Sequence, residues 1–281
     1  MAAEQTAIRR IMVALDASES SLSALHNAVD LAARLGAQLI GLYVEDINLL
    51  RLAQLPIAHE VSAFSQTLRR LDGLDLERQF RDDAARVHRA ILNICAERNV
   101  PCRFEVFRGL VAAELLAAAA QADLMVVGKI GRSYSGTKRI GSITRMIVSR
   151  RTGLTLILQS GALLTILPVV LLYDGSPQAR KSLAVAAHLA RAPQGRLTVF
   201  VVADNRQDAR RFETEVLEYL QVYELGAEFR LLVRDALAGI AQRIRLESAG
   251  PVVIPCGAQE QEGEQLCALI SEISNPVLLV R

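Results

Sequence analysis

The sequence predicts an α/β fold with two tandem domains, each a parallel sheet covered by helices on both faces. Short apolar runs alternate with segments of helical periodicity, which is typical of parallel strands joined by helices. Residues 16–46 also align without a gap on residues 174–204, and nine of these pairs are identical. We interpret this repeat as a tandem duplication, and the 281 residues suffice for two domains that each bury a core.

The first half can be divided into elements by its apolar pattern. Ile11 to Leu15 is an apolar run that predicts the first strand, and the repeat places a helix and a second apolar strand after it. Further on, Phe80, Val87 and Ile91 lie on one side of an amphipathic helix. The expected order is strand 8–15, helix 19–35, strand 37–44, an excursion over 45–72, helix 74–98, strand 102–107, helix 111–121, strand 123–127, helix 143–150 and strand 154–158.

The second half opens in the same way as the first. Its first strand ends in Asp174-Gly175-Ser176, just as the first strand of the chain ends in Asp16-Ala17-Ser18. We place the two domains at 1–160 and 165–281. The strands expected in the second are Val169 to Leu172, Leu197 to Val202, Val252 to Ile254 and Val277 to Val280.

Composition and one apolar stretch bear on the class of protein. Leu154 to Tyr173 resembles a transmembrane span, but the repeat makes Val169 the start of a sheet strand. A net charge of +2 is too balanced for a general nucleic-acid binder. The first ten residues lack an apolar signal core, and the four cysteines form no C-x-x-C motif. We therefore expect a cytoplasmic protein that binds neither membranes nor nucleic acid.

The most informative motif is a glycine-rich segment that follows the apolar run Leu124 to Val127. A glycine-rich turn from a strand into a helix lets backbone N–H groups converge on an anion, so a phosphate-binding loop is predicted. Ser142 is the expected N-cap of the next helix. The spacing G-x2-G-x9-G-S is made by Gly128, Gly131, Gly141 and Ser142. The surrounding cations are Lys129, Arg132, Lys138 and Arg139.

The residue order excludes two familiar phosphate-binding loops and favours a third. Gly136-Thr137-Lys138 reverses the order that a Walker A motif needs, and the Rossmann G-x-G-x-x-G is absent. The spacing instead resembles the nucleotide-binding signature of the universal stress protein family, whose domains also open with a strand, an aspartate and a helix. The resemblance covers both halves. It implies Rossmann-like, doubly wound sheets with strand order 3-2-1-4-5.

That resemblance also implies roles for individual residues. In this strand order the ligand crevice lies where strands one and four end, at Asp16 and Gly128. Asp16 and Val44 would contact the adenosine of ATP, and Gly128 would let the backbone approach the ribose. Gly131, Gly141 and Ser142 would hold the phosphates, which would also carry any bound Mg²⁺. On electrostatic grounds Lys138 and Arg139 are candidate phosphate neighbours or a solvated loop edge, and Asp16 has a second candidate role as a helix cap.

The second half departs from the binding pattern. Residues 255–264 lack the glycine spacing and carry three glutamates without Lys or Arg, so they are expected to repel phosphate. Asp174 is then expected to act as a helix cap. We therefore expect one nucleotide per chain, bound in the first domain.

The resemblance implies a nucleotide-dependent stress-response or regulatory module. The sequence lacks the residues that efficient phosphoryl transfer usually needs. Slow ATPase activity, or autophosphorylation on Ser142 or Thr144, is an alternative. A nucleotide-free interaction module is the third alternative. Strands 154–158 and 277–280 are expected to pair as an internal pseudo-dimer. A homodimer and an unidentified protein partner stay open, and the excursion 45–72 is either a lid or a partner-binding arm.

Overall fold

The computed structural model describes residues 8–61, 68–131, 140–150, 153–162, 164, 168–191, 195–233, 237–247, 250–257 and 260–281. The chain divides into two compact units, Met1–Asp123 and Leu124–Arg281. The second unit therefore contains the end of the first copy together with the whole second copy. The domain limits 1–160 and 165–281 follow the sequence repeat and stay a prediction.

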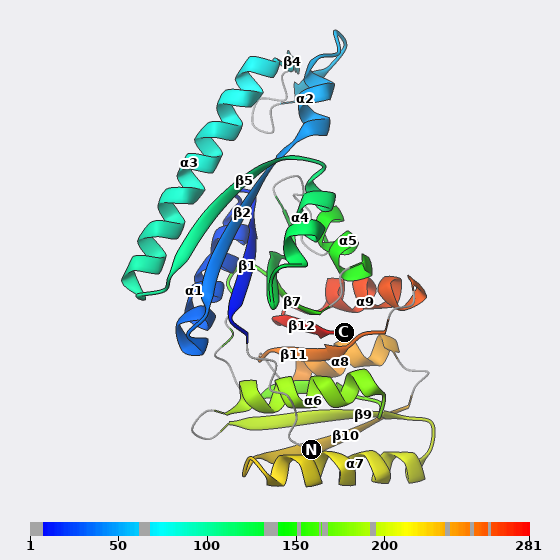
Figure 1. The fold of residues 1–281 in the computed structure, drawn as a ribbon. Coiled ribbons are helices and arrows are strands. Elements are labelled where there is room, and N and C mark those ends of the chain that lie inside the picture. The colour runs from blue at the N-terminus through cyan, green and yellow to red at the C-terminus, as the bar shows by residue number, and fades with distance from the viewer. Residues whose placement is uncertain are drawn as a thin grey trace. The chain divides into compact units, whose positions relative to one another are not determined.

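The first unit is built on a parallel sheet in the order β5-β2-β1. Helices α1 and α3 pack on one face of this sheet and α4 packs on the other (Figure 1). The elements are β1 (Arg10–Leu15), α1 (Glu19–Leu35), β2 (Gln38–Asp46), α2 (Ile47–Ala53), β3 (His59–Val61), β4 (Leu68–Arg70), α3 (Gly73–Glu97), β5 (Cys102–Gly109) and α4 (Val111–Ala119).

The excursion between β2 and α3 has secondary structure of its own. It forms helix α2 and the antiparallel hairpin β3-β4. Asp46 begins α2 by accepting a hydrogen bond from the Asn48 N–H at 2.8 Å, as an N-cap does. Ala53 of α2 then packs against Tyr43, Leu76 and Phe80. The excursion is thus fixed to the end of β2 and the start of α3 by a small apolar core.

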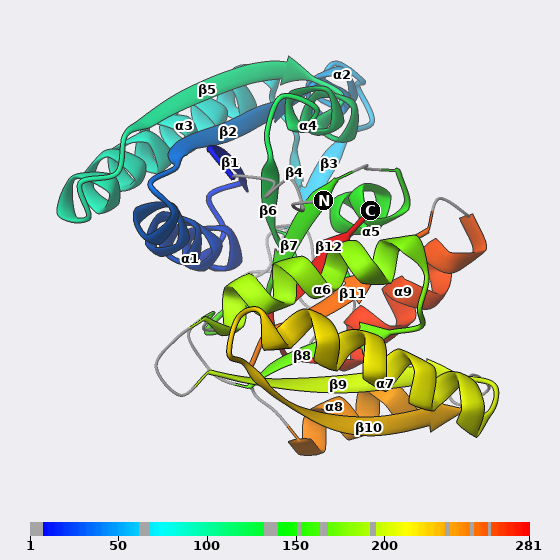
Figure 2. The ribbon, with the colours of Figure 1, turned by 60° about the horizontal axis from the view of Figure 1, so that its bottom comes forward.

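The second unit is a larger sheet in the order β10-β9-β8-β11-β12-β7-β6. Helices α6 and α7 cover one face, and α5, α8 and α9 cover the other (Figure 2). The elements are β6 (Leu124–Gly128), α5 (Ser142–Arg150), β7 (Leu154–Leu158), β8 (Val169–Tyr173), α6 (Pro177–Ala190), β9 (Arg196–Ala203), α7 (Arg206–Gln221), β10 (Gly226–Val233), α8 (Leu237–Glu247), β11 (Val252–Pro255), α9 (Glu260–Glu272) and β12 (Val277–Val280).

The strand order confirms the predicted fold class. Strands β8 to β12 are the five strands of the second copy, and their spatial order is 3-2-1-4-5. In the first copy, β5-β2-β1 gives the order 3-2-1, and β6 pairs with β7 as strands four and five. Pairing register recurs as well, because Ile11 lies opposite Leu39 as Val169 lies opposite Leu197. Both pairs are related by the same offset as the sequence repeat.

The last strands of the two copies lie side by side in the second unit. β7 pairs with β12 in antiparallel register, with Leu156 opposite Leu278, while the other pairs in this sheet are parallel. The predicted pairing of these two strands is therefore observed. The apolar stretch 154–173 contributes strands β7 and β8 to the sheet. In the part of the chain that the structure describes, every helix is too short or too polar to cross a membrane.

Candidate functional site

Asp16 closes a short turn between β1 and α1. Its Oδ1 accepts hydrogen bonds from the Ser18 N–H at 3.0 Å and from the Ser18 hydroxyl at 2.5 Å. Ser18 is the N-cap of α1, because its Oγ accepts from the Ser21 N–H at 3.1 Å. The prediction that Asp16 caps the helix is therefore wrong, since Asp16 orients the serine that does.

The second copy repeats this turn. Asp174 accepts from the Ser176 N–H at 3.0 Å, and Ser176 caps α6 through the Ala179 N–H. Asp174 is likewise not the cap that we predicted. The two copies differ at the middle residue of the turn, which has a positive φ of 61° at Ala17 and 73° at Gly175. Only glycine adopts this conformation without cost, so the first copy carries strain that the second lacks.

Val44 lies beside the Asp16 turn. It belongs to β2, whose residue Tyr43 pairs with Leu15 at the end of β1, so Val44 and Asp16 follow adjacent residues of two paired strands. Val44 is half-buried. The first unit thus brings together the two residues that were expected to contact adenosine.

The second unit holds the glycine half of the predicted site. Gly128 ends β6, and the Gly141 N–H donates to the Lys129 carbonyl at 2.9 Å, which closes the base of the loop. A Cβ added at Gly141 would lie 3.4 Å from the Gly131 nitrogen. Two of the signature glycines therefore meet backbone to backbone, directly before the first turn of α5, where N–H groups lack partners within the helix.

The start of α5 differs from the prediction in one detail. The Arg145 N–H donates to the Gly141 carbonyl at 2.9 Å, so Gly141 has the N-cap position and Ser142 is the first helical residue. Ser142 is exposed. Thr144 is buried, and its hydroxyl donates to the Gly128 carbonyl at 2.8 Å. Of the two hydroxyls considered for autophosphorylation, only that of Ser142 is accessible.

Lys129 does not contribute to a ring of cations around the loop. The residue is 5% exposed, and its Nζ donates to the carbonyls of Ile273 at 2.7 Å and Ser271 at 3.3 Å. A third bond reaches Gln159 Oε1 at 3.3 Å. Burial lowers the pKa of Lys129 to about 8. The prediction is wrong for this residue, while Arg132, Lys138 and Arg139 lie outside the described residues.

The corresponding connection of the second copy is short. β11 ends at Pro255 and α9 begins at Glu260, so Glu260, Glu262 and Glu264 belong to the first turns of the helix rather than to a loop. Acidic side chains are favourable at a helix N-terminus because they face the positive end of its dipole. The same charges repel a phosphate from this terminus.

Phe212 of α7 packs against the Asp174 turn of the second copy. A Cβ added at Gly175 would overlap the Phe212 ring, and the Tyr173 ring meets it edge-on with the centroids 6.0 Å apart. The Arg211 guanidinium lies over the same ring at 5.0 Å. The turn of the second copy is therefore packed against an aromatic side chain of its own chain.

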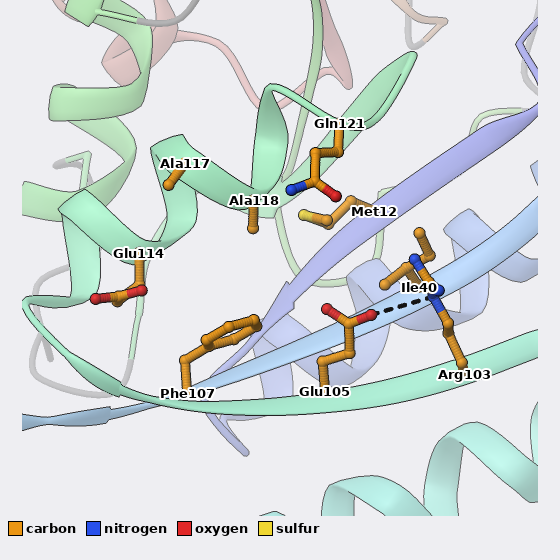
Figure 3. Close-up of a pocket in the computed structure, with 9 residues that line it drawn as sticks. All are labelled: Met12, Ile40, Arg103, Glu105, Phe107, Glu114, Ala117, Ala118 and Gln121. Carbon is orange, nitrogen blue, oxygen red and sulfur yellow. Dashed lines mark ion pairs between the residues drawn. The ribbon is translucent and has the colours of Figure 1, made fainter.

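A shallow hollow in the first unit lies elsewhere. It is bounded by α4 and the sheet face, where Ala117 and Ala118 leave space above Phe107 (Figure 3). The ion pair between Arg103 and Glu105, 3.1 Å long, is part of its lining. None of the predicted site residues lines this hollow, so we do not assign the nucleotide to it.

Comparisons with known proteins identify a family and a fold. The sequence model of the universal stress protein family matches residues 7–152. No curated protein matches the sequence. A universal stress protein from Archaeoglobus fulgidus is 15% identical with a TM-score of 0.73, covering 97% of this chain and 96% of that one. A putative universal stress protein from Pseudomonas aeruginosa is 14% identical with a TM-score of 0.58, covering 98% and 94%. At these identities the two structures show a shared fold.

Proposed function

Since this chain belongs to the universal stress protein family, we propose that it is a nucleotide-dependent regulatory module that binds ATP through the glycine loop of its first copy. One observation carries this proposal. Gly141 is held against Gly131 by a hydrogen bond across the base of the loop, directly at the N-terminus of α5. This arrangement aims backbone N–H groups and the helix dipole at one place, which suits a phosphate.

The proposed roles follow the two halves of the site. Asp16 and Val44 contact the adenosine, and Gly128 leaves room for the ribose. Phosphates lie against the backbone of Gly131 and Gly141 and on that of Ser142, with Lys138 and Arg139 as neighbouring cations. The N–H of Gly141 is engaged with the Lys129 carbonyl, so Gly141 leaves room for the phosphates rather than donating to them. Any Mg²⁺ is bound through the phosphates. The residues that the structure describes contain no cluster of three or more His, Cys, Asp or Glu side chains arranged for a metal.

We propose that the second copy binds no nucleotide. Phe212 covers its Asp174 turn, and a connection from Pro255 to Glu260 replaces the long glycine loop. The acidic first turns of α9 add repulsion. The chain therefore has one nucleotide site, and the second copy serves a structural role.

The test is a titration with ATP and with AMP, by calorimetry, on the wild-type chain and on two glycine variants. We expect one ATP per chain, with weaker binding of AMP. Gly131→Val and Gly141→Val should abolish binding, because the valine branches would fill the space between the two loop stems. At about 100 times its dissociation constant, ATP should stabilise the wild type by roughly 2.7 kcal/mol and leave the variants unchanged.

Gly226→Val is the matched control, because a Cβ at Gly226 has no atom within 4 Å. It should bind ATP as the wild type does. Two nucleotides per chain would show that the second copy is active. Absence of binding to the wild type would favour the nucleotide-free interaction module. Release of inorganic phosphate, or labelling of Ser142, would favour slow catalysis.

A further inference from the structure

Lys129 connects the glycine loop to the last helix of the second copy. It is the first residue after β6, and its backbone N–H donates to the Leu158 carbonyl at 2.7 Å. Its carbonyl accepts the hydrogen bond from Gly141 that closes the loop. Through its main chain, Lys129 therefore bonds the first stem of the loop to β7 and to Gly141 of the second stem.

The side chain of the same residue holds α9. Its ammonium donates to the carbonyls of Ser271 and Ile273 at the C-terminal end of that helix. A cation is favourable there because the last carbonyls of a helix lack partners and carry partial negative charge. Lys129 is 5% exposed, and a buried ammonium that loses its hydrogen-bond acceptors has nothing to offset its desolvation. The contact is therefore costly to break.

A second contact of the same kind joins a cation of the second copy to a helix of the first. Arg281 follows β12, and its guanidinium donates to the carbonyls of Val148 and Ser149 near the C-terminus of α5. Helices α5 and α9 pack together (Figure 2). Gly263 permits a close approach to Ser149. Each copy thus supplies a cation to the helix that precedes the last strand of the other copy.

We infer that Lys129 is a positioning residue for the nucleotide site, through which α9 of the second copy holds Gly141 and the N-terminus of α5 in place. The inference rests on the proposed function. Lys129 contacts no phosphate in this arrangement, since its ammonium is fully engaged with α9 and Gln159. Its effect on binding is transmitted through the bond between its carbonyl and Gly141. The non-binding second copy is in this way part of the binding site of the first.

The test compares Lys129→Met with Arg245→Met in the full-length chain. Methionine keeps most of the alkyl chain and removes the ammonium. Arg245 of α8 is the matched control, because its Nη1 donates to the Glu272 carbonyl at 3.1 Å and so serves the same end of α9 without touching the loop. Lys129→Met should weaken ATP binding about tenfold, as expected for coupled sites, and Arg245→Met should leave affinity within about twofold.

Hydrogen exchange of the Gly141 amide is the second measurement. It should accelerate in Lys129→Met and stay unchanged in Arg245→Met. The carbonyl of residue 129 that accepts from this amide is kept in Lys129→Met, but it is no longer held in place by the ammonium contacts with α9. This readout does not depend on nucleotide, so it still decides the inference if the wild type binds no ATP and the proposed function fails. Lys129→Gln, which keeps a donor, gives the same comparison if the methionine variant does not fold.

Three outcomes would overturn the inference. One is ATP affinity of Lys129→Met equal to that of the wild type. Another is an equal loss of affinity in both variants with an equal loss of stability, which would mean that any weakening of α9 has the same effect. The third is unchanged exchange of the Gly141 amide in both Lys129 variants.

Discussion

At the scale of single residues, the middle position of the Asp-x-Ser turn gives opposite expectations in the two copies. Ala17→Gly should relieve strain, because glycine adopts a φ of 61° freely. Glycine also loses more backbone entropy on folding, which offsets part of this gain and leaves a net stabilisation of about 0.5–1 kcal/mol. Gly175→Ala should destabilise it by about 2 kcal/mol or more, because the new methyl group overlaps Phe212. Urea unfolding measures both. Equal signs for the two changes would contradict the assigned geometry.

Burial of Lys129 predicts a pH dependence of stability. Its pKa is lowered from 10.5 to about 8 in the folded protein, so between these values the unfolded chain binds more protons than the folded one. Stability should then rise with pH across this window, and stay level below it. The difference in unfolding free energy between the wild type and Lys129→Met should change by about 1–2 kcal/mol in favour of the wild type from pH 7 to 9.5.

The variant is needed as the reference because other buried groups titrate in the opposite sense. Burial raises the pKa of Cys95 and of Tyr219 to about 12. In alkaline solution such groups lower stability, since the unfolded chain loses their protons first. Both proteins share these groups, so their contribution cancels. Parallel pH profiles of the two proteins would show that Lys129 is not buried as described.

Residue identities predicted the ends of the strands but not the directions of side chains. Asp16 was correctly placed directly after β1 and Gly128 at the end of β6, because a run of apolar residues followed by a turn residue marks a strand end. Lys129 was counted among the cations around the loop because a sequence shows charge without showing burial. Phe212 was missed for a similar reason, since its partner Gly175 is distant in the chain and only the folded sheet brings them together.

At the scale of elements, the pairing of β7 with β12 is the feature with the clearest test. Both strands are buried, and each would be an unpaired apolar edge if its half were alone. Residues 1–162 and 163–281, expressed separately, should therefore associate with each other or aggregate. Light scattering of the separate and mixed halves measures this. Two well-behaved monomers without mutual affinity would contradict the expectation.

Element boundaries were predictable where a periodic pattern was long. The helix expected over 74–98 is α3 at Gly73–Glu97, because an amphipathic pattern over many turns leaves little freedom. The acidic segment 255–264 was taken for a loop, and its second half, 260–264, is the start of α9. Glutamate suits a first helical turn as well as it suits a loop, so composition alone could not separate the two.

At the scale of the whole molecule, the fold was predicted mainly from the sequence repeat. A single offset fixed the first strand, the first helix and the second strand of both copies, and the observed register of β1 with β2 and of β8 with β9 has the same offset. What the repeat could not supply is the difference between the copies. That difference lies in the connections, where the link from β2 to α3 contains α2 and a hairpin, while β9 reaches α7 through two residues.

The antiparallel pairing of β7 with β12 has a consequence for how such an assembly evolves. Separate chains that pair through a strand are in equilibrium with their monomers and dissociate on dilution. Copies joined in one polypeptide meet at a fixed effective concentration, on the order of millimolar for short linkers. The partner of the glycine-loop copy is then always the same sequence, present in a ratio of one to one. Such a permanent partner is free to lose its own ligand and specialise as a support.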